Sequence, residues 1–287
     1  MKIGFVTSEE DPNLVKDDRL AIPFLKKHGY SVSPLVWDHI SDVSQFDALI
    51  FRSCWNYHRK FTAFQIWLQE LRQLKIPIFN SLNTIAWNLN KKHIIEFENT
   101  FAVPKTKLVE RHASFSPQNL EEIFDLWKVD QLVIKPAVSL NGHDTYLLNK
   151  SESVKIEKLI LDLTQDRDLL IQEFIPEIRT KGEVSLVFFN KKFNHAVRKV
   201  PAKNEFRVHS EYGGTRTSTI TSPEATAYAT ALLKQIPDNL LFARVDIVEA
   251  KKGPILIELE LTDPTLYLAT SDGAAKQFAS AILDVLS

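Results

Sequence analysis

Two apolar segments joined by a tight turn constrain the fold of this chain more than any other feature. Residues 240–265 alternate apolar and polar side chains on both sides of a turn at 251–254, and a period of two predicts two paired β-strands. The alternation puts three carboxylates on one face of the pair, those of Asp246, Glu258 and Glu260. The sequence therefore predicts that three acidic side chains converge across one hairpin.

This acidic face has two interpretations. Carboxylates two residues apart on a strand have Cα atoms roughly 6.5–7 Å apart, a span that fits one hard cation or brackets two ions about 3.5–4 Å apart. Oxygen ligands without His or Cys favour magnesium over zinc. The same pattern is typical of the solvated face of an ordinary hairpin, and the hairpin alone does not decide between them.

Composition narrows the class of partner. A chain of 287 residues has room for two or three subdomains. The net charge of −1 offers no basic surface for nucleic acid or an anionic membrane, so we expect a small-molecule partner. The first apolar run is too short for a signal peptide, and no window reaches the ~18 apolar residues of a membrane span. We therefore expect a cytoplasmic protein, in which the single cysteine, Cys54, serves packing.

The first 88 residues predict a small open α/β layer with the order β-α-β-β-α-β. The expected strands cover 2–7, 31–37, 47–51 and 76–79, and the expected helices cover 17–28 and 61–74. Gly29 is a suitable stop for the first helix, whereas Pro23 conflicts with its interior.

A polar segment with two aromatic residues follows the third expected strand. Open α/β sheets bind ligands in the loops beyond the carboxyl ends of their strands, so we expect Arg52 there to bind a substrate carboxylate through its two-pronged guanidinium. Trp55 and Tyr57 are candidates for the same pocket. A surface ion pair is the alternative role for Arg52.

The middle of the chain predicts a phosphate-binding loop. A domain boundary is expected near residue 88, before a short helix over 89–98. A strand over 131–135 ends in Lys135, and the polar loop after it, which contains Ser139 and Gly142, precedes a strand over 145–148. Backbone N–H groups of such a loop can fold over phosphates, with Lys135 as a point charge. A Walker motif is absent from the sequence.

The second half of the chain predicts strands over 169–176, 181–189 and 193–200, and helices over 222–235 and 272–286. The strand over 169–176 closes on Pro176, where a purine ring could lie against backbone amides. A Gly-Gly pair follows Arg207, and on its own this segment is also typical of a strand and turn.

Taken together, these segments resemble an ATP-grasp ligase of the glutathione-synthetase-like branch, and within it the cyclo-ligases that close O-ureido-serine to cycloserine. The resemblance covers nearly the whole chain and rests on the order and spacing of six segments: Lys91, Lys135, 172–178, 182–183, 204–214, and Asp246 with 258–265. It implies an α/β fold in which an N-terminal open α/β domain (1–88) precedes two lobes that clasp ATP (89–170 and 171–287).

The resemblance also implies roles for single residues. The expected ATP contacts are Lys91 and Lys135 on the α- and β-phosphates, Ser139 and Gly142 in the covering loop, Gln172, Glu173, Phe174 and Ile175 around the adenine, and Glu183 on the ribose. The expected catalytic groups are Lys135, Lys199 facing the terminal phosphate, and Arg207 on the γ-phosphate and the tetrahedral intermediate, with Gly213 and Gly214 behind it near the substrate. The expected ligands of two Mg²⁺ ions are Asp246, Glu258 and Glu260.

Two positions depart from the family pattern. The third metal position, often Asn in the superfamily, is Glu260 here. The phosphate-covering loop contains the single glycine Gly142, where many relatives have several.

The activity implied is that of a carboxylate-amine ligase. A substrate carboxylate attacks the γ-phosphorus of ATP to give an acyl phosphate, an amine displaces the phosphate, and ADP and phosphate are released. The expected partners are small-molecule acids and amines, without nucleic acid or membrane, and the family also implies a homo-oligomer. The alternatives are a regulatory ATP-binding protein without ligation and a phosphotransferase that stops after the first step.

Overall fold

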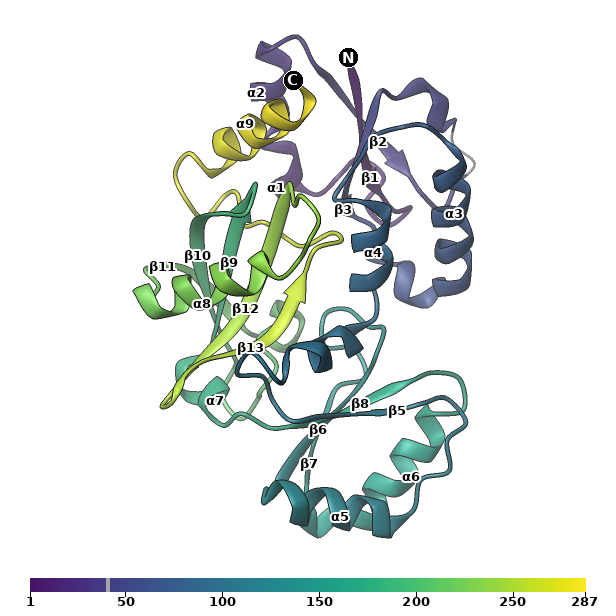
Figure 1. The fold of residues 1–287 in the computed structure, drawn as a ribbon, viewed down its shortest axis with the longest axis vertical. Helices are drawn as coiled ribbons and strands as arrows, with labels where there is room; N and C mark the ends of the chain where they lie inside the picture. Colours follow the sequence, from purple (N-terminus) through teal and green to yellow (C-terminus); the bar gives the residue numbers. More distant parts are fainter. Residues whose placement is uncertain (40–41) are drawn as a thin grey trace.

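The computed structural model describes residues 1–39 and 42–287, which form three sheets in three regions of the molecule (Figure 1). The N-terminal sheet has the strand order β2-β1-β3-β4 and is parallel throughout. Its strands are β1 (Lys2–Thr7), β2 (Ser31–Val36), β3 (Ala48–Ser53) and β4 (Ile78–Phe79). Its larger helix is α3 (Phe61–Gln73). The predicted open α/β layer is confirmed.

The helix expected over 17–28 is instead two short helices, α1 (Lys16–Arg19) and α2 (Ile22–Lys27). Pro23 lies in the first turn of α2, where its missing N–H costs no intrahelical hydrogen bond. The expectation of one continuous helix is wrong for that reason. Gly29, at φ +83°, ends α2 as predicted.

The connection from the N-terminal sheet contains a helix that the sequence patterns did not indicate. Helix α4 (Leu82–Asn88) begins at Ser81, whose hydroxyl accepts a hydrogen bond from the Thr84 N–H. The helix expected over 89–98 is a 3-10 helix, η3 (Lys91–Phe97).

The second region, the small lobe, is an antiparallel sheet of order β5-β8-β6-β7. Its elements are β5 (Thr106–Val109), α5 (Pro117–Trp127), β6 (Gln131–Pro136), β7 (Tyr146–Asn149), η4 (Lys150–Glu152), α6 (Ser153–Leu163) and β8 (Leu169–Glu173). Both helices lie at the end of the molecule farthest from the termini (Figure 1). The division expected at 170/171 falls inside β8, so we propose that the small lobe extends to Glu173.

The third region, the large lobe, contains a five-stranded antiparallel sheet of order β11-β10-β9-β12-β13. Its elements are α7 (Glu177–Lys181), β9 (Glu183–Phe189), β10 (Lys192–Val200), η5 (Ser210–Tyr212), β11 (Thr215–Thr219), α8 (Pro223–Lys234), β12 (Phe242–Ala250), β13 (Gly253–Glu260) and α9 (Ala274–Leu286). Strand β9 is buried along its whole length because one face packs with α8 and the other with α9.

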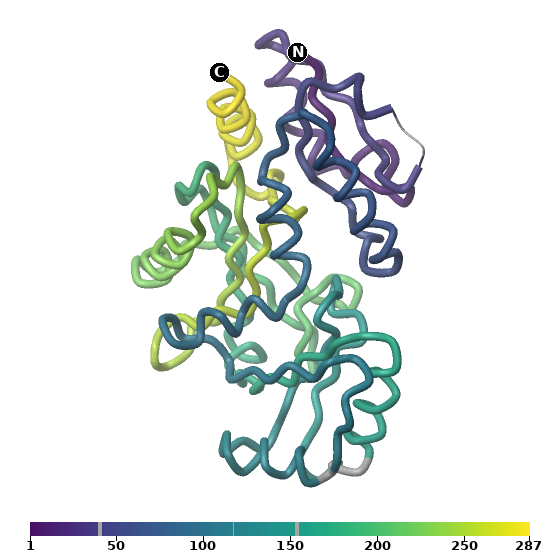
Figure 2. The backbone as a smooth tube through the Cα atoms, turned by 45° about the vertical axis from the view of Figure 1, so that its right-hand side comes forward, coloured from purple at the N-terminus to yellow at the C-terminus, as the bar shows by residue number. Residues whose placement is uncertain are grey.

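The N-terminal sheet and the large lobe share one hydrophobic core. Ile3, Phe5 and Ile50 of the N-terminal sheet belong to the same buried cluster as Phe278 and Ile282 of α9. Helix α9 returns to pack beside α2, as both backbone views show (Figures 1 and 2). The buried residues of the small-lobe core, in contrast, all come from 109–171.

Candidate active site

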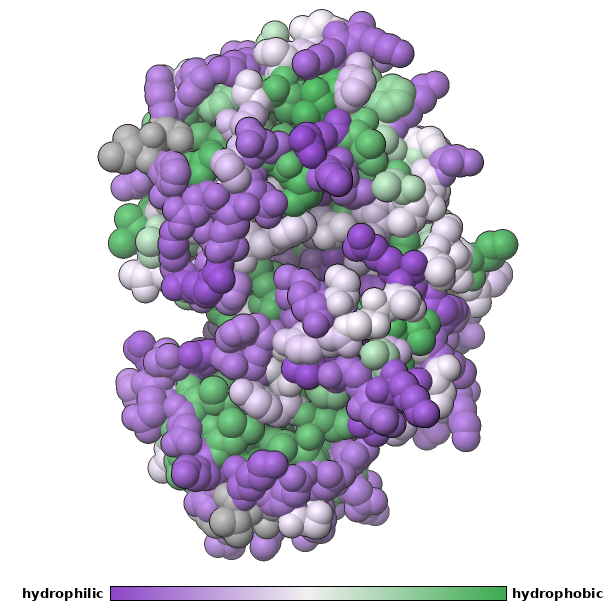
Figure 3. All heavy atoms as spheres, turned by 180° about the vertical axis from the view of Figure 1, so that it is seen from behind, coloured by the Kyte–Doolittle hydropathy of each residue, from purple (hydrophilic) through white to green (hydrophobic). Residues whose placement is uncertain are grey.

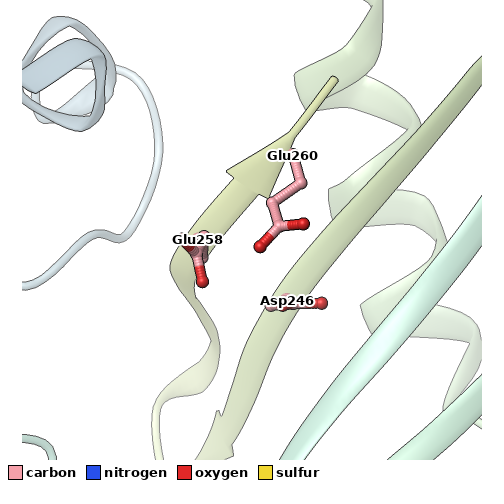
Figure 4. Close-up of side chains that lie close together, drawn as sticks. All are labelled: Asp246, Glu258 and Glu260. Carbon is pink, nitrogen blue, oxygen red and sulfur yellow. The ribbon is translucent and has the colours of Figure 1, made fainter. Parts of the chain in front are cut away.

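The three predicted carboxylates meet on β12 and β13, the last two strands at one side of the large-lobe sheet. Strands β12 and β13 pair antiparallel, with Asp246 opposite Glu258 and Arg244 opposite Glu260. One carboxylate oxygen from each of Asp246, Glu258 and Glu260 lies within 4.8 Å of the other two, and the side chains point toward a common centre (Figure 4). The predicted convergence across the hairpin is confirmed.

Basic side chains surround this carboxylate cluster. Arg244 Nη2 lies 2.9 Å from Asp246 Oδ2 and 2.7 Å from Glu260 Oε1. Lys199 Nζ lies 3.1 Å from Asp246 Oδ2 and also pairs with Glu183. Glu258 pairs with Lys91. Each of the three carboxylates therefore has a cation beside it.

These charges shift the pKa values of the carboxyl groups in opposite directions. Burial alone would raise the pKa of Glu258, but Lys91, Lys135 and Arg244 together outweigh it and lower that pKa to about 2. Burial likewise opposes ionisation of Asp246, yet Arg244 and Lys199 hold its pKa below the ordinary range. Glu260 has its pKa raised to about 7 by burial and by the charges of Glu258 and Asp246. Three carboxylates whose oxygen atoms lie within 4.8 Å of one another fit a hard divalent cation held by oxygen atoms, such as Mg²⁺.

A cavity between the two lobes, the inter-lobe chamber, lies on one side of the cluster. Glu258 and Arg207 line it. So do all nine residues predicted to contact ATP, which are Lys91, Lys135, Ser139, Gly142, Gln172, Glu173, Phe174, Ile175 and Glu183. Seen from behind, the surface is indented between the small lobe and the rest of the molecule (Figure 3). Residues far apart in the sequence, between Lys91 and Glu258, therefore line one cavity.

The wall contributed by β8 and the segment after it is mainly apolar. Phe174 packs edge-to-face on Phe206, with ring centroids 6.1 Å apart. Gln172 is oriented by a hydrogen bond from its Nε2 to Thr106 Oγ1, 3.0 Å. Lys135 lines the chamber from β6, the strand paired with β8, and burial lowers its pKa to about 8. The chamber therefore offers a flat apolar surface and lysine charge in one space.

The segment before β11 covers the loop that contains Gly142. Tyr212 Oη donates to the carbonyl oxygen of Gly142 at 3.3 Å, and the Arg207 guanidinium lies 3.5 Å from the centre of the Tyr212 ring. Glu205 holds Arg207 by a 2.7 Å ion pair. A Cβ added at Gly142 would lie 3.1 Å from His209 Nδ1. The small lobe and the large lobe therefore touch at this loop.

A second cavity, the arginine chamber, lies on the other side of the cluster. Its lining includes Arg244, Arg216, Glu260, Lys199 and Trp55, together with Glu211, Gly214 and Tyr267. The guanidinium carbons of Arg216 and Arg244 each lie 5.7 Å from the Tyr267 ring centre. Because Glu258 lines one chamber and Glu260 the other, the carboxylate cluster joins the two cavities.

Two of the residues expected at the substrate pocket are elsewhere. Arg52 lies inside β3 and is fully buried. Its Nη2 lies 2.8 Å from Asp18 Oδ1 and 2.9 Å from the carbonyl oxygen of Pro264. Tyr57 stacks on Phe64 in the N-terminal core. The expectation that both line a pocket is wrong, because β3 continues two residues farther than predicted and the turn after it directs Tyr57 inward.

Other expected substrate residues are at or near the arginine chamber. Trp55 and Gly214 line it, and Trp55 Nε1 donates to the carbonyl oxygen of Asp263, 3.0 Å. Gly213 adopts φ +78° at the end of η5. A Cβ at Gly214 would lie 2.2 Å from the carbonyl oxygen of Val208, so the backbone requires glycine there.

Sequence reasoning assigned no role to two residues that the structure places at the site. Arg244 precedes Asp246 by two residues on β12, so the alternation that identified the aspartate was also a signal for the arginine. His209 lines both chambers, and no pattern in the sequence indicated it.

Comparisons with known proteins agree with this geometry. The family described as "Prokaryotic glutathione synthetase, ATP-grasp domain" matches residues 92–271. The chain belongs to this ATP-grasp family. The N-terminal domain of "D-cycloserine synthetase DcsG" matches residues 3–80. The protein is therefore an ATP-dependent ligase that forms an amide between a carboxylate and an amine, as the resemblance implied, and its family uses ATP with Mg²⁺.

Relatives of this ATP-grasp ligase cover most of its length. The cycloserine biosynthesis protein DcsG of Streptomyces lavendulae is 22% identical over 260 residues, which is 87% of this chain and 86% of that protein. The glutathione synthetase of Ralstonia nicotianae is 24% identical over 247 residues, 84% of this chain and 71% of that protein.

Solved structures share the fold. The crystal structure of D-cycloserine synthetase DcsG superposes with a TM-score of 0.88 at 20% identity and full coverage of both chains. The ATP complex of D-alanine–D-alanine ligase from Bacillus anthracis gives 0.68 at 17% identity, covering 99% of this chain and 95% of that chain. Among the described residues, no helix is long and apolar enough to cross a membrane.

Proposed function

We propose that this ligase closes one small amino-acid-like molecule into a ring, with O-ureido-serine as the first candidate. The observation that carries the proposal is the carboxylate cluster shared by the two chambers, since Glu258 lines one and Glu260 the other. ATP in the inter-lobe chamber would direct its terminal phosphate toward this cluster, where a substrate carboxylate from the arginine chamber can meet it. The match of residues 3–80 to the N-terminal domain of D-cycloserine synthetase and the similarity to DcsG over 260 residues support a cyclising reaction.

The acidic residues of the site would bind the metal, and its basic residues would bind the phosphates. Asp246, Glu258 and Glu260 would bind two Mg²⁺ ions. The bound metal would neutralise negative charge on the phosphates. Lys91 and Lys135 would hold the α- and β-phosphates. Both lysines line the inter-lobe chamber on the side of Glu258.

The remaining basic residues would neutralise the negative charge of the transferred phosphoryl group and of the tetrahedral intermediate. Arg207 lines the inter-lobe chamber, Lys199 lines the arginine chamber, and Arg244 stands beside the cluster. Preorganised cations at the place where negative charge develops stabilise the transition state directly. Trp55 and Arg216 would contact the rest of the substrate from the outer side of the arginine chamber.

A joining of two separate molecules is the second candidate, favoured by the relatedness to glutathione synthetases and α-L-glutamate ligases. The test is to supply ATP, Mg²⁺ and either O-ureido-serine alone or pairs of amino acids, and to measure ADP and phosphate together. Release of both with the single substrate, abolished in Glu258→Gln, supports the cyclising reaction. Release only with pairs supports joining of two molecules, and ADP without phosphate supports a phosphotransferase.

A further inference from the structure

The wall between the two chambers contains one side chain that can accept a proton. Four of the described residues line both chambers: Leu140, Asn141, Val208 and His209. Leu140 and Val208 are apolar, and the Asn141 amide is not a base. The imidazole of His209 therefore stands alone among these four as a basic group between the expected phosphates and the arginine chamber.

The surroundings of His209 orient its ring and leave it without a partner. Nδ1 is buried and has no hydrogen-bond partner in the described part of the chain. It faces the backbone of Gly142, where an added Cβ would lie 3.1 Å away, and Tyr212 packs edge-to-face on the ring at 6.5 Å. Nε2 is the other ring nitrogen, and we assign to it the contact with a ligand in the chambers that His209 lines.

Burial and the nearby cations keep the imidazole of His209 neutral. Burial, followed by Lys199, lowers its pKa to about 4, with Arg244 acting in the same direction and Glu258 and Glu211 opposing them. The neighbouring Arg207 and Tyr212 complete the groups packed around it. Phosphates of ATP in the adjoining chamber add negative charge, which raises the basicity of an imidazole. A neutral imidazole has a lone pair on one ring nitrogen with which it can accept a proton.

We propose that His209 is a catalytic residue whose Nε2 accepts the proton lost by the attacking amine. This inference rests on the proposed function. In the second half of the reaction the attacking nitrogen, which is an amine or, in O-ureido-serine, the ureido N–H bonded to oxygen, forms a bond to the carbonyl carbon of the acyl phosphate, and the bond from that carbon to the phosphate oxygen breaks. The carbamoyl group of O-ureido-serine stays on that nitrogen in this step. Phosphate leaves with the electron pair, and the amine proton passes to His209. A base is needed here and not in the first half, because the attacking carboxylate carries no proton.

The two half-reactions can be measured separately with hydroxylamine. Hydroxylamine is a weakly basic amine, largely unprotonated at pH 7, and it captures an acyl phosphate as a hydroxamate without a protein base. We expect His209→Gln to slow amide formation from O-ureido-serine by roughly 100-fold or more, with hydroxamate formation and ATP affinity within about threefold of wild type. His143→Gln is the matched control, since this exposed histidine is next to Gly142 and lines neither chamber.

The outcomes separate this inference from the proposed function. A parallel loss of amide and hydroxamate in His209→Gln would overturn the role as a base, because it would place His209 in the first half-reaction or in the fold. Unchanged amide formation would overturn it as well. If wild type forms neither amide nor hydroxamate from O-ureido-serine or from amino-acid pairs, the proposed function fails first and this inference fails with it. Restoration of amide formation in His209→Ala by added imidazole would be further support.

Discussion

The inter-lobe chamber lies between two lobes with separate cores, whereas the arginine chamber is lined mostly by the large lobe, which shares a core with the N-terminal sheet. The small-lobe core draws its buried residues from 109–171, and its contact with the large lobe at Gly142 is one hydrogen bond and close packing. The N-terminal sheet and the large lobe are joined through α9 and α2. We infer that the inter-lobe chamber opens to admit ATP, while the arginine chamber is largely preassembled.

The largest effect is expected at the cluster that joins the two chambers. Glu258→Gln removes a negative ligand from the carboxylate cluster that joins the two chambers, so we expect turnover to fall by at least roughly a thousandfold, since a bound metal contributes several kcal/mol. Steady-state release of ADP and phosphate measures it. Glu249→Gln, on the same sheet but paired with Arg198 away from both chambers, should retain activity. Near-normal turnover in Glu258→Gln would contradict the metal assignment.

The next largest effect tests the shared core. Arg52→Ala leaves Asp18 buried without its ion-pair partner, so we expect the free energy of unfolding to fall by about 3–5 kcal/mol. Urea denaturation measures it. Arg59→Ala is the control, because Arg59 pairs with Glu10 on the surface of the same domain, and a surface pair contributes at most about 1 kcal/mol. Unchanged stability together with a raised KM for the substrate would instead restore Arg52 to the substrate pocket.

A smaller effect tests the inter-lobe chamber through pH. Burial lowers the pKa of Lys135 to about 8, so the free protein loses this charge as the pH rises through 8. Bound phosphate favours the protonated lysine, and binding above pH 8 must then take up a proton. We expect ATP affinity to fall by up to about tenfold between pH 8 and 9. Calorimetry in buffers of different ionisation enthalpy measures both quantities, and the same slope in Lys135→Met would refute the assignment.

The smallest effect tests the contact between the lobes. Gly142 and Gly29 both have positive φ angles, +66° and +83°. A Cβ added at Gly142 would press on His209 and Arg207, whereas a Cβ added at Gly29 would have no other atom within 4 Å. Alanine at either position should cost about 1 kcal/mol of stability. Only Gly142→Ala should also lower kcat/KM, by several-fold, because it disturbs closure. Equal kinetics for the two variants would show that this contact has no part in closure.

Much of the site was predictable because its signals are local. Alternation along 240–265 predicted the hairpin and the common face of Asp246, Glu258 and Glu260, since strand geometry directs every second side chain to the same side. The resemblance, carried by motif order, predicted the ATP-grasp fold and the residues around the inter-lobe chamber. The departures were at strand and helix ends, as at Pro23 and Arg52, where one or two residues change which way a side chain points.

The sequence by itself determined the family, the hairpin of carboxylates and the residues that line the inter-lobe chamber, because periodicity and motif order are properties of the chain alone. Only the tertiary structure decided the partners of single charges. Arg52 meets Asp18 across 34 positions and Pro264 across 212, and His209 becomes a wall between two cavities only when the small-lobe loop at Gly142 packs on it. Such contacts depend on how separate elements dock, and docking is set by the burial of whole faces, which no short segment encodes.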